Sequence, residues 1–178
     1  MKIKLLIQLF AVIFISPLTG NWTADATKAK ITFTVDGPFG KVHGSFSGLK
    51  SAFQFNENDL SGSKLTASID PNTVNSGVGL RNTHLRNDEQ FLNTKKYPEI
   101  RFSSRKIVKS PDGYLLTGDL TLKGITKSIE IPFTFSPAGN TGIFKGRFTI
   151  KRLDYQIGKE GGSVGSTINI NIEVPLKK

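Results

Sequence analysis

The feature that most constrains the fold is a period of two in the apolar residues, repeated along most of the chain. It is clearest in the segment 168–174, whose isoleucine and valine residues alternate with Asn169, Asn171 and Glu173. Alternate residues of a β-strand lie on one face, and an antiparallel strand commonly buries only one face. The same alternation recurs in the segments 31–35, 53–55, 65–69, 100–108, 116–122, 129–135 and 144–150. The sequence therefore predicts an all-β chain of eight antiparallel strands.

Turn-forming residues separate these segments, among them Asp36-Gly37-Pro38 and Pro111-Asp112-Gly113. Lys123-Gly124 stands directly between two alternating segments, which predicts a two-residue hairpin. Short strands at this spacing are typical of a sandwich or a closed barrel. Periodicity alone does not choose between them, although glycines inside the segments, such as Gly118 and Gly146, favour barrel corners or a cavity that the backbone approaches closely.

One long segment, residues 73–97, breaks the period of two. Within it, Asn87-Asp88-Glu89-Gln90-Phe91-Leu92 has the order of an N-cap, an acidic first turn and a short helix. Loops on a rigid scaffold often present a functional site. We therefore expect a partly helical crossover between strands. It either carries function or only closes one end of a barrel, and both interpretations stay open.

The N-terminal residues have the order of a secretory signal peptide. Lys2 and Lys4 precede an almost unbroken apolar run at 5–15, and small residues follow at 16–20. The run is too short to span a bilayer, which takes about 20 apolar residues. We expect residues 1–20 to be the signal peptide and residues 21–178 to be one exported domain, soluble in the periplasm or outside the cell. One alternative is a second cleavage site near Ala26. The other is a buried N-terminal helix in place of a signal peptide.

Composition excludes several kinds of chemistry. The chain of 178 residues has no cysteine and two histidines, which removes thiolate catalysis, cysteine-bound zinc and iron–sulfur clusters. It has neither the Gly-x-Ser-x-Gly motif of α/β-hydrolases nor a Walker loop. The formal net charge is +10, which suits anionic partners such as a membrane surface, or only keeps an exported protein in solution. Nucleic acid is not expected, because the chain contains no recognised DNA-binding motif.

Several motifs, in this order and spacing, resemble one known family. They are Val42–Gly48, Leu80–Asn87, Lys96–Ser104, Leu116–Lys127 and Arg152–Gly158. The chain is similar over nearly its whole length after residue 20 to the YceI-like family of exported, polyisoprenoid-binding proteins. The resemblance implies an eight-stranded antiparallel lipocalin-like barrel around a long apolar tunnel that holds an isoprenoid or another long-chain lipid. It implies no catalysis, no metal and no cofactor other than the bound lipid.

The sequence departs from the family pattern at two places. Asp36-Gly37-Pro38 stands where the family usually has a histidine after the first strand, and Asn82 stands where it usually has an aspartate. Both departures bear on the preferred head group of the lipid more than on the fold.

The expected site has two parts. A lipid tail gains from burial, at about 25 cal/mol per Å² of apolar area, so apolar side chains should line its tunnel. The residues expected to do so are Phe39, Phe91, Tyr97, Phe102, Leu120, Phe133 and Phe148. A polar or anionic head group needs donors, and the crossover supplies Arg81, His84, Arg86 and Lys96. Arg152 and Asp154 are expected to hold a loop in place, either through a salt bridge or through hydrogen bonds to the backbone.

The expected function is to hold a polyprenyl phosphate, quinone, fatty acid or amide for storage, transport or stress protection. The alternative is a structural or protein-interaction module of the cell envelope without a bound lipid. The expected partners are the lipid ligand and a transient contact with a membrane surface. A homodimer stays open.

Overall fold

The computed structural model describes residues 21–178, so the expected signal peptide, residues 1–20, lies outside the described residues. The described chain forms one antiparallel sheet of ten strands. The strands are β1 (Asn21–Ala24), β2 (Lys30–Gly37), β3 (Gly40–Phe46), β4 (Lys50–Gln54), β5 (Lys64–Ile69), β6 (Ile100–Ser110), β7 (Gly113–Leu122), β8 (Ile125–Ala138), β9 (Thr141–Lys151) and β10 (Thr167–Lys177). The helices are the 3-10 helices η1 (Pro71–Thr73) and η2 (Arg152–Tyr155) and the α-helix α1 (Gly79–Asn87).

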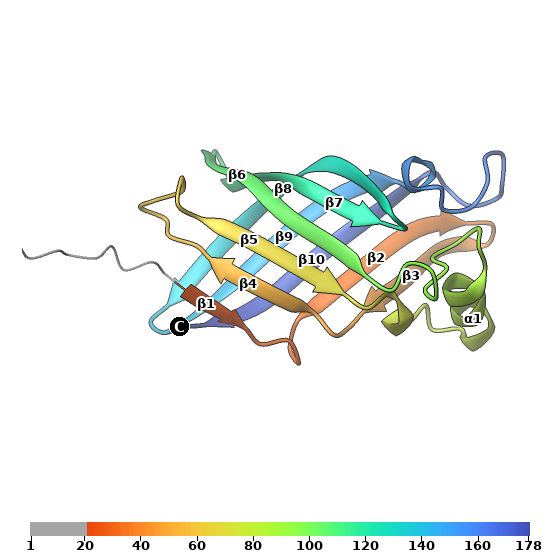
Figure 1. The fold of residues 1–178 in the computed structure, drawn as a ribbon, viewed down its shortest axis with the longest axis horizontal. Helices are drawn as coiled ribbons and strands as arrows, with labels where there is room; N and C mark the ends of the chain where they lie inside the picture. The colour runs from red at the N-terminus through yellow and green to blue at the C-terminus, as the bar shows by residue number, and fades with distance from the viewer. Residues whose placement is uncertain (1–20) are drawn as a thin grey trace, which may run out of the picture.

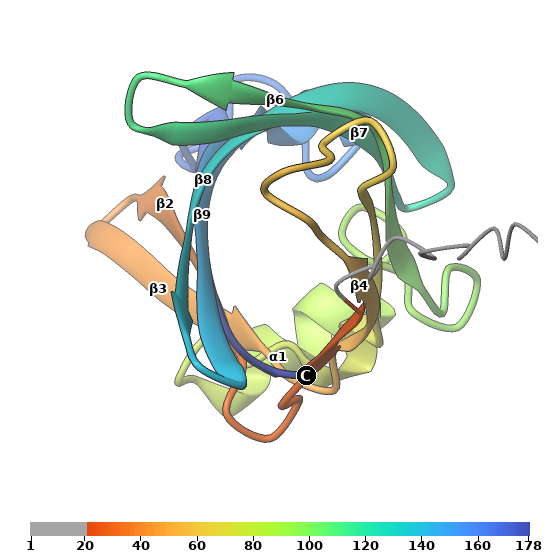
Figure 2. The ribbon, with the colours of Figure 1, turned by 90° about the vertical axis from the view of Figure 1, so that its left-hand side faces the viewer.

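Eight of the strands close into a ring in the order β1-β4-β5-β6-β7-β8-β9-β10, because β1 pairs with β10. Figure 2 shows the ring from the end at which the C terminus lies. The short strand β1 makes the closure, because it pairs with β4 at Asn21 and Trp22 and with β10 at Thr23 and Ala24. The predicted eight-stranded antiparallel barrel is therefore confirmed. Seven of the eight segments that alternate in the sequence lie within strands, and the eighth, 53–55, runs one residue past the end of β4.

The hairpin of β2 and β3 continues the sheet beyond the ring. Strand β10 pairs with β1 only at Leu176 and Lys177, and along 168–173 it pairs with β2. Strand β3 has a weak sequence pattern because a glycine, Gly44, occupies one of its apolar-facing positions. A Cβ there would lie 2.2 Å from the ring of Phe33, so the side chain of the neighbouring strand takes that space.

The crossover contacts the outer strand of this hairpin. Within residues 21–178, β3 pairs with no strand except β2, and a single bridge between Ser45 and Asn75 joins it to the crossover. The helix expected at 87–92 is wrong, because α1 ends at Asn87. The Asp88 carboxylate accepts a hydrogen bond from the Gln90 amide at 2.8 Å, so it closes a turn rather than starting a helix. Among the described residues, no helix is long and apolar enough to cross a membrane.

The predicted two-residue hairpin at Lys123-Gly124 is confirmed. Leu122 pairs with Ile125, and both turn residues have positive φ, 52° and 74°. This is the conformation that matches the twist of two paired strands. The Lys123 ammonium donates a hydrogen bond to the Gln156 carbonyl at 2.6 Å, which ties the turn to the loop after η2. Burial lowers the pKa of Lys123.

One end of the barrel interior is filled by a cluster of aromatic rings. The ring of Phe133 stacks on Tyr114 and on Phe144, with centroids 5.1 and 4.8 Å apart. Trp22 contacts Phe135 edge-on at 4.9 Å and donates its indole N–H to the Phe55 carbonyl. We call these residues, with Phe53 and Phe55, the aromatic plug. It lies at the end of the barrel where β1 and the C terminus meet, away from α1 (Figure 1).

Candidate functional site

The barrel encloses a cavity of about 210 Å³ beside the aromatic plug. Its wall comes from the inward faces of the strands and includes Phe33, Phe46, Phe102, Leu120, Phe148 and Ile170. On β9 the lining residues run from Phe144 to Ile150. The six steps along the strand between these two residues cover about 20 Å. A small volume spread over this length describes a narrow bore.

Different residues lie at the two ends of the bore. The aromatic plug, which includes the lining residues Phe53 and Phe144, fills the end near the C terminus. At the other end the lining residues come from outside the strands: Val74, Leu85 and Leu92 of the crossover and Ile157 after η2. Helix α1, which carries Leu85, buries none of its nine residues. The cover at this end is therefore a loop and a surface helix rather than paired strands.

The cavity offers almost no polar surface. Ser51 is among the few polar residues of its wall, and the Oγ atom of Ser51 is buried without a hydrogen-bond partner among the described residues. A charged or strongly polar ligand group inside this wall would lose its water without replacement bonds, at a cost of several kcal/mol. The interior is thus suited to a hydrocarbon chain.

Three of the seven residues expected to bind the tail line the cavity: Phe102, Leu120 and Phe148. The other four lie elsewhere. Phe133 is buried in the aromatic plug. Phe91 and Tyr97 belong to the crossover, where Tyr97 packs against Gly124. Phe39 lies at the tip of the β2–β3 hairpin, and its side chain is fully exposed, at 102%.

The four basic residues expected at the head group all lie on the crossover, at the end that it covers, but they do not converge on one pocket. None of them lines the cavity. Arg86 donates to the Val74 carbonyl at 3.0 Å, which holds the crossover to itself. The Lys96 ammonium lies 5.5 Å from the centre of the Tyr97 ring. Arg81 is half-buried and His84 is exposed.

Sequence reasoning missed the crossover residues of the cavity, Leu85 and Leu92. They stand in a basic, non-alternating segment, so nothing in the period of the sequence marks them. The missed wall residues of the strands, such as Phe33 and Ile170, do carry a signal, because each lies on the apolar face of an alternating segment.

Two phenols near the core have raised pKa values. Burial, with a hydrogen bond to Glu57, raises the pKa of the Tyr114 phenol to about 12. Burial, with the nearby Asp154, raises the pKa of Tyr155 to about 12. Both phenols stay protonated, whereas a general base works best with a pKa near the working pH. Among residues 21–178, no group of three or more His, Asp or Glu side chains is placed to hold a metal ion.

Comparison with known proteins decides the family. A family model described as a YceI-like domain matches residues 22–176. The chain belongs to the YceI-like family. The UPF0312 protein of Pectobacterium atrosepticum is 33% identical over 139 residues, which cover 75% of this chain and 72% of that relative. A UPF0312 protein of Yersinia enterocolitica is 30% identical over the same share of both chains.

Solved structures share the fold of this YceI-like chain. The YCEI protein of Campylobacter jejuni superposes with a TM-score of 0.69 at 26% identity, covering 77% of this chain and 85% of the other. BcnA of Burkholderia cenocepacia reaches a TM-score of 0.81 at 22% identity, covering 86% and 99%. A polyisoprenoid-binding domain of Saccharophagus degradans, implicated in plant cell wall breakdown, reaches 0.68 at 15% identity, covering 88% and 97%. The last two show the fold alone.

Proposed function

We propose that this YceI-like protein binds the hydrocarbon tail of a long-chain amphiphile inside the barrel. The observation that carries the proposal is the narrow bore, whose wall is almost wholly apolar over about 20 Å of strand. A linear tail presents a large apolar area to such a wall, and each Å² removed from water is worth about 25 cal/mol. A sugar or a nucleotide would find few hydrogen-bond partners in this wall.

The two ends of the bore give the tail a direction. Because the stacked rings of Phe133 and Phe144 occupy the plug end, the tail is proposed to enter at the crossover and to leave its head group there. Arg81, His84, Arg86 and Lys96 belong to that cover and are proposed to contact an anionic head group. The isoprenoid class is the first to test, because the Saccharophagus degradans domain with this fold is polyisoprenoid-binding. Quinones, fatty acids and amides are the others.

The proposed role is storage, transport or stress protection by an exported binding protein without catalysis. The apolar character of the site supports binding, and the family to which the chain belongs supports the same class of role. Export rests on the N-terminal residues 1–20.

The test is lipid extraction from the purified protein, followed by mass spectrometry. We expect one long-chain amphiphile in near-stoichiometric amount. Ala67 lines the cavity on β5, so Ala67→Phe fills the bore and should lower the bound lipid by about tenfold, at a stability cost of about 1–3 kcal/mol. Ala52, exposed on the adjacent strand β4, gives the control: Ala52→Phe adds the same ring outside the barrel and should keep the lipid.

Two results would contradict the proposal. One is the absence of any long-chain lipid after mild purification together with no uptake of an added isoprenoid. The other is an equal loss of lipid in both variants while both stay folded by circular dichroism. Either result would favour a structural or protein-interaction module without a bound lipid.

A further inference from the structure

Exposed apolar side chains are concentrated at one end of the barrel. Among residues 21–178, the exposed large apolar residues are Phe39, Val78, Leu80, Ile143 and Val164. All except Ile143 lie on the three segments that surround the α1 end: the tip of the β2–β3 hairpin, the N-terminal part of the crossover helix and the loop after η2. Single exposed apolar residues are ordinary, but four on three segments at one end of a barrel are a concentration, and we call these four residues the patch.

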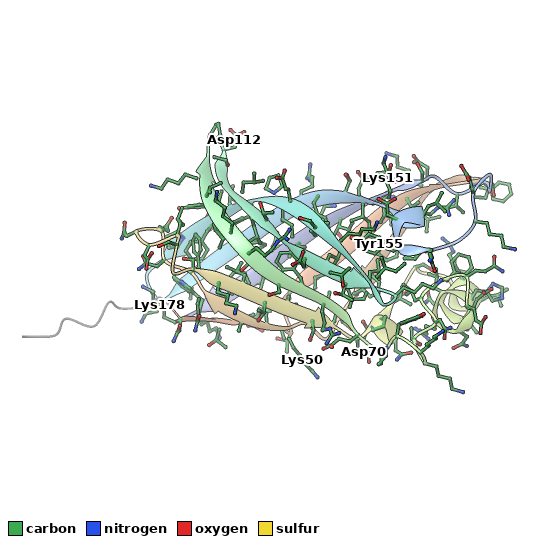
Figure 3. All side chains as sticks on the ribbon, turned by 45° about the horizontal axis from the view of Figure 1, so that its top comes forward. Lys50, Asp70, Asp112, Lys151, Tyr155 and Lys178 are labelled. Carbon is green, nitrogen blue, oxygen red and sulfur yellow. The ribbon has the colours of Figure 1, made fainter. Side chains whose placement is uncertain are left out.

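Backbone contacts hold these three segments together. The Gly165 amide donates to the Asp36 carbonyl at 2.7 Å, which joins the loop after η2 to the hairpin. The Gly158 amide donates to the Gln90 carbonyl, which joins the same loop to the crossover. Figure 1 shows the hairpin tip, this loop and α1 together at one end. Figure 3 places Lys178 at the other end, away from Tyr155 of η2.

The two most exposed members cannot be explained by packing within the chain. The Phe39 side chain is exposed to 102% and that of Leu80 to 69%. Phe39 stands on a Gly-Pro-Phe-Gly tip, where a polar turn residue would serve the fold equally well. Leu80 projects from α1, the helix whose Leu85 covers the bore.

Basic residues outnumber acidic ones on the three segments of the patch, whose acidic residues are Asp36, Asp88, Glu89 and Glu160. Helix α1 contains Arg81, His84 and Arg86 and no acidic residue. Exposed lysines follow on the crossover, Lys95 and Lys96, and Lys41 stands two residues after Phe39. From Asn21 onward the chain has a formal net charge of +8, because Lys2 and Lys4 account for two of the +10 charges of the full sequence. This charge draws it toward negative surfaces over a distance of about a Debye length.

We infer that the α1 end of the barrel docks on an anionic lipid membrane, with Phe39 and Leu80 inserted among the lipids and Val78 and Val164 beside them. Apolar tips combined with basic residues are how peripheral proteins bind an interface. Docking at this end brings the loop-and-helix cover of the bore against the membrane. A tail that leaves the bore there would not cross water.

The test measures partition of the chain from Asn21 onward, which holds every strand of the closed ring, onto sedimented vesicles. Phosphatidylcholine vesicles with and without phosphatidylglycerol are compared. We expect binding to the anionic vesicles, reduced at high salt, and a loss of about tenfold in the partition coefficient for Phe39→Ser. Leu80→Ser should give a similar loss. Ile143 is the matched control, because it is exposed to 39% on β9 at the opposite end, and Ile143→Ser should change partition by less than about twofold.

The outcomes separate docking from tail binding. Uptake of a fluorescent fatty acid in the absence of vesicles reports on the bore alone, and Phe39→Ser should leave it unchanged. Failure of the unaltered chain to bind anionic vesicles would overturn the inference, whatever lipid is extracted from it. Equal losses for Phe39→Ser and Ile143→Ser would also overturn it. The unaltered protein could also form a dimer in solution without binding vesicles. If Phe39→Ser then abolished the dimer, the patch would be assigned to a second copy of the chain, and membrane docking would be overturned.

Discussion

A single buried guanidinium organises the loop that carries part of the docking patch. Arg152 is only 5% exposed, and its nitrogens donate to the carbonyls of Ile157, Lys159, Val164 and Gly165 at 2.9 to 3.0 Å. The expectation that Arg152 holds a loop in place is confirmed, through backbone carbonyls. A planar fork with five donors can serve several acceptors at once, which a lysine ammonium cannot do in the same geometry.

Replacing Arg152 should therefore destabilise the protein strongly. We expect Arg152→Met to lower the free energy of unfolding by about 3 kcal/mol, because buried carbonyls lose their donors. Arg152→Lys should recover only part of this loss. Urea unfolding measures the change, and the exposed Arg147 on β9 gives the control, since Arg147→Met should cost less than about 1 kcal/mol. Equal costs at both positions would refute the role of Arg152.

Among the elements, the β7–β8 hairpin shows how a turn fixes the crossover as well as the strand register. Gly124 has a φ of 74°, and a Cβ at this position would lie 2.7 Å from the Tyr97 ring. The end of the crossover thus packs on a turn that tolerates no side chain. This contact places Tyr97 outside the cavity, beside the turn.

Gly124→Ala should lower the free energy of unfolding by more than backbone strain alone would. A residue other than glycine at positive φ costs about 1 kcal/mol. Gly139 isolates this term, because its φ is 60° and nothing lies within 4 Å of a Cβ built there. We expect Gly139→Ala to lower the free energy of unfolding by about 1 kcal/mol and Gly124→Ala by about 2–3 kcal/mol. Thermal or urea unfolding measures both, and equal losses would show that Tyr97 does not constrain the turn.

At the scale of the whole molecule, the barrel has two unlike ends. Paired strands and the aromatic plug close the end near the C terminus, whereas a surface helix and loops close the other. This difference sets the proposed arrangement, in which the tail lies in the bore and the head group and the membrane lie at the α1 end. A ligand can enter only if the cover of the bore opens. Segments with few buried contacts open locally at the lowest free-energy cost, so they suit this position.

The head-group proposal predicts a difference between ligands rather than a general loss of binding. Arg81→Ala combined with His84→Ala should weaken binding of an anionic long-chain lipid several-fold more than that of a neutral lipid of equal tail length. The excess loss should shrink at high salt. Fluorescence titration with a fatty acid and its alcohol measures both. Lys109→Ala, on β6 near the opposite end, is the control for lost charge. Equal losses for the two lipids would mean that Arg81 and His84 only support the cover.

The sequence by itself determined most elements of this barrel. The alternation of apolar and polar residues is a local property of a strand, and it does not depend on which strands pair with it. It identified eight of the ten strands as alternating segments and the Lys123-Gly124 turn. It also marked the crossover as a break in period. The phenylalanine pattern indicated an apolar interior but not which rings face the bore.

Only the tertiary structure decided how the ring closes and where each side chain lies along it. The pairing of β1 with β10 joins residues at the two ends of the described chain, and a four-residue strand is too short to show a period. Phe133 and Phe148 have the same inward alternation, yet one lies in the aromatic plug and the other on the cavity wall, because depth along the barrel follows from strand register. The position of Phe39 outside the barrel is also a consequence of how the strands are arranged. The tip of a hairpin that extends past the ring has no partner strand to pack against.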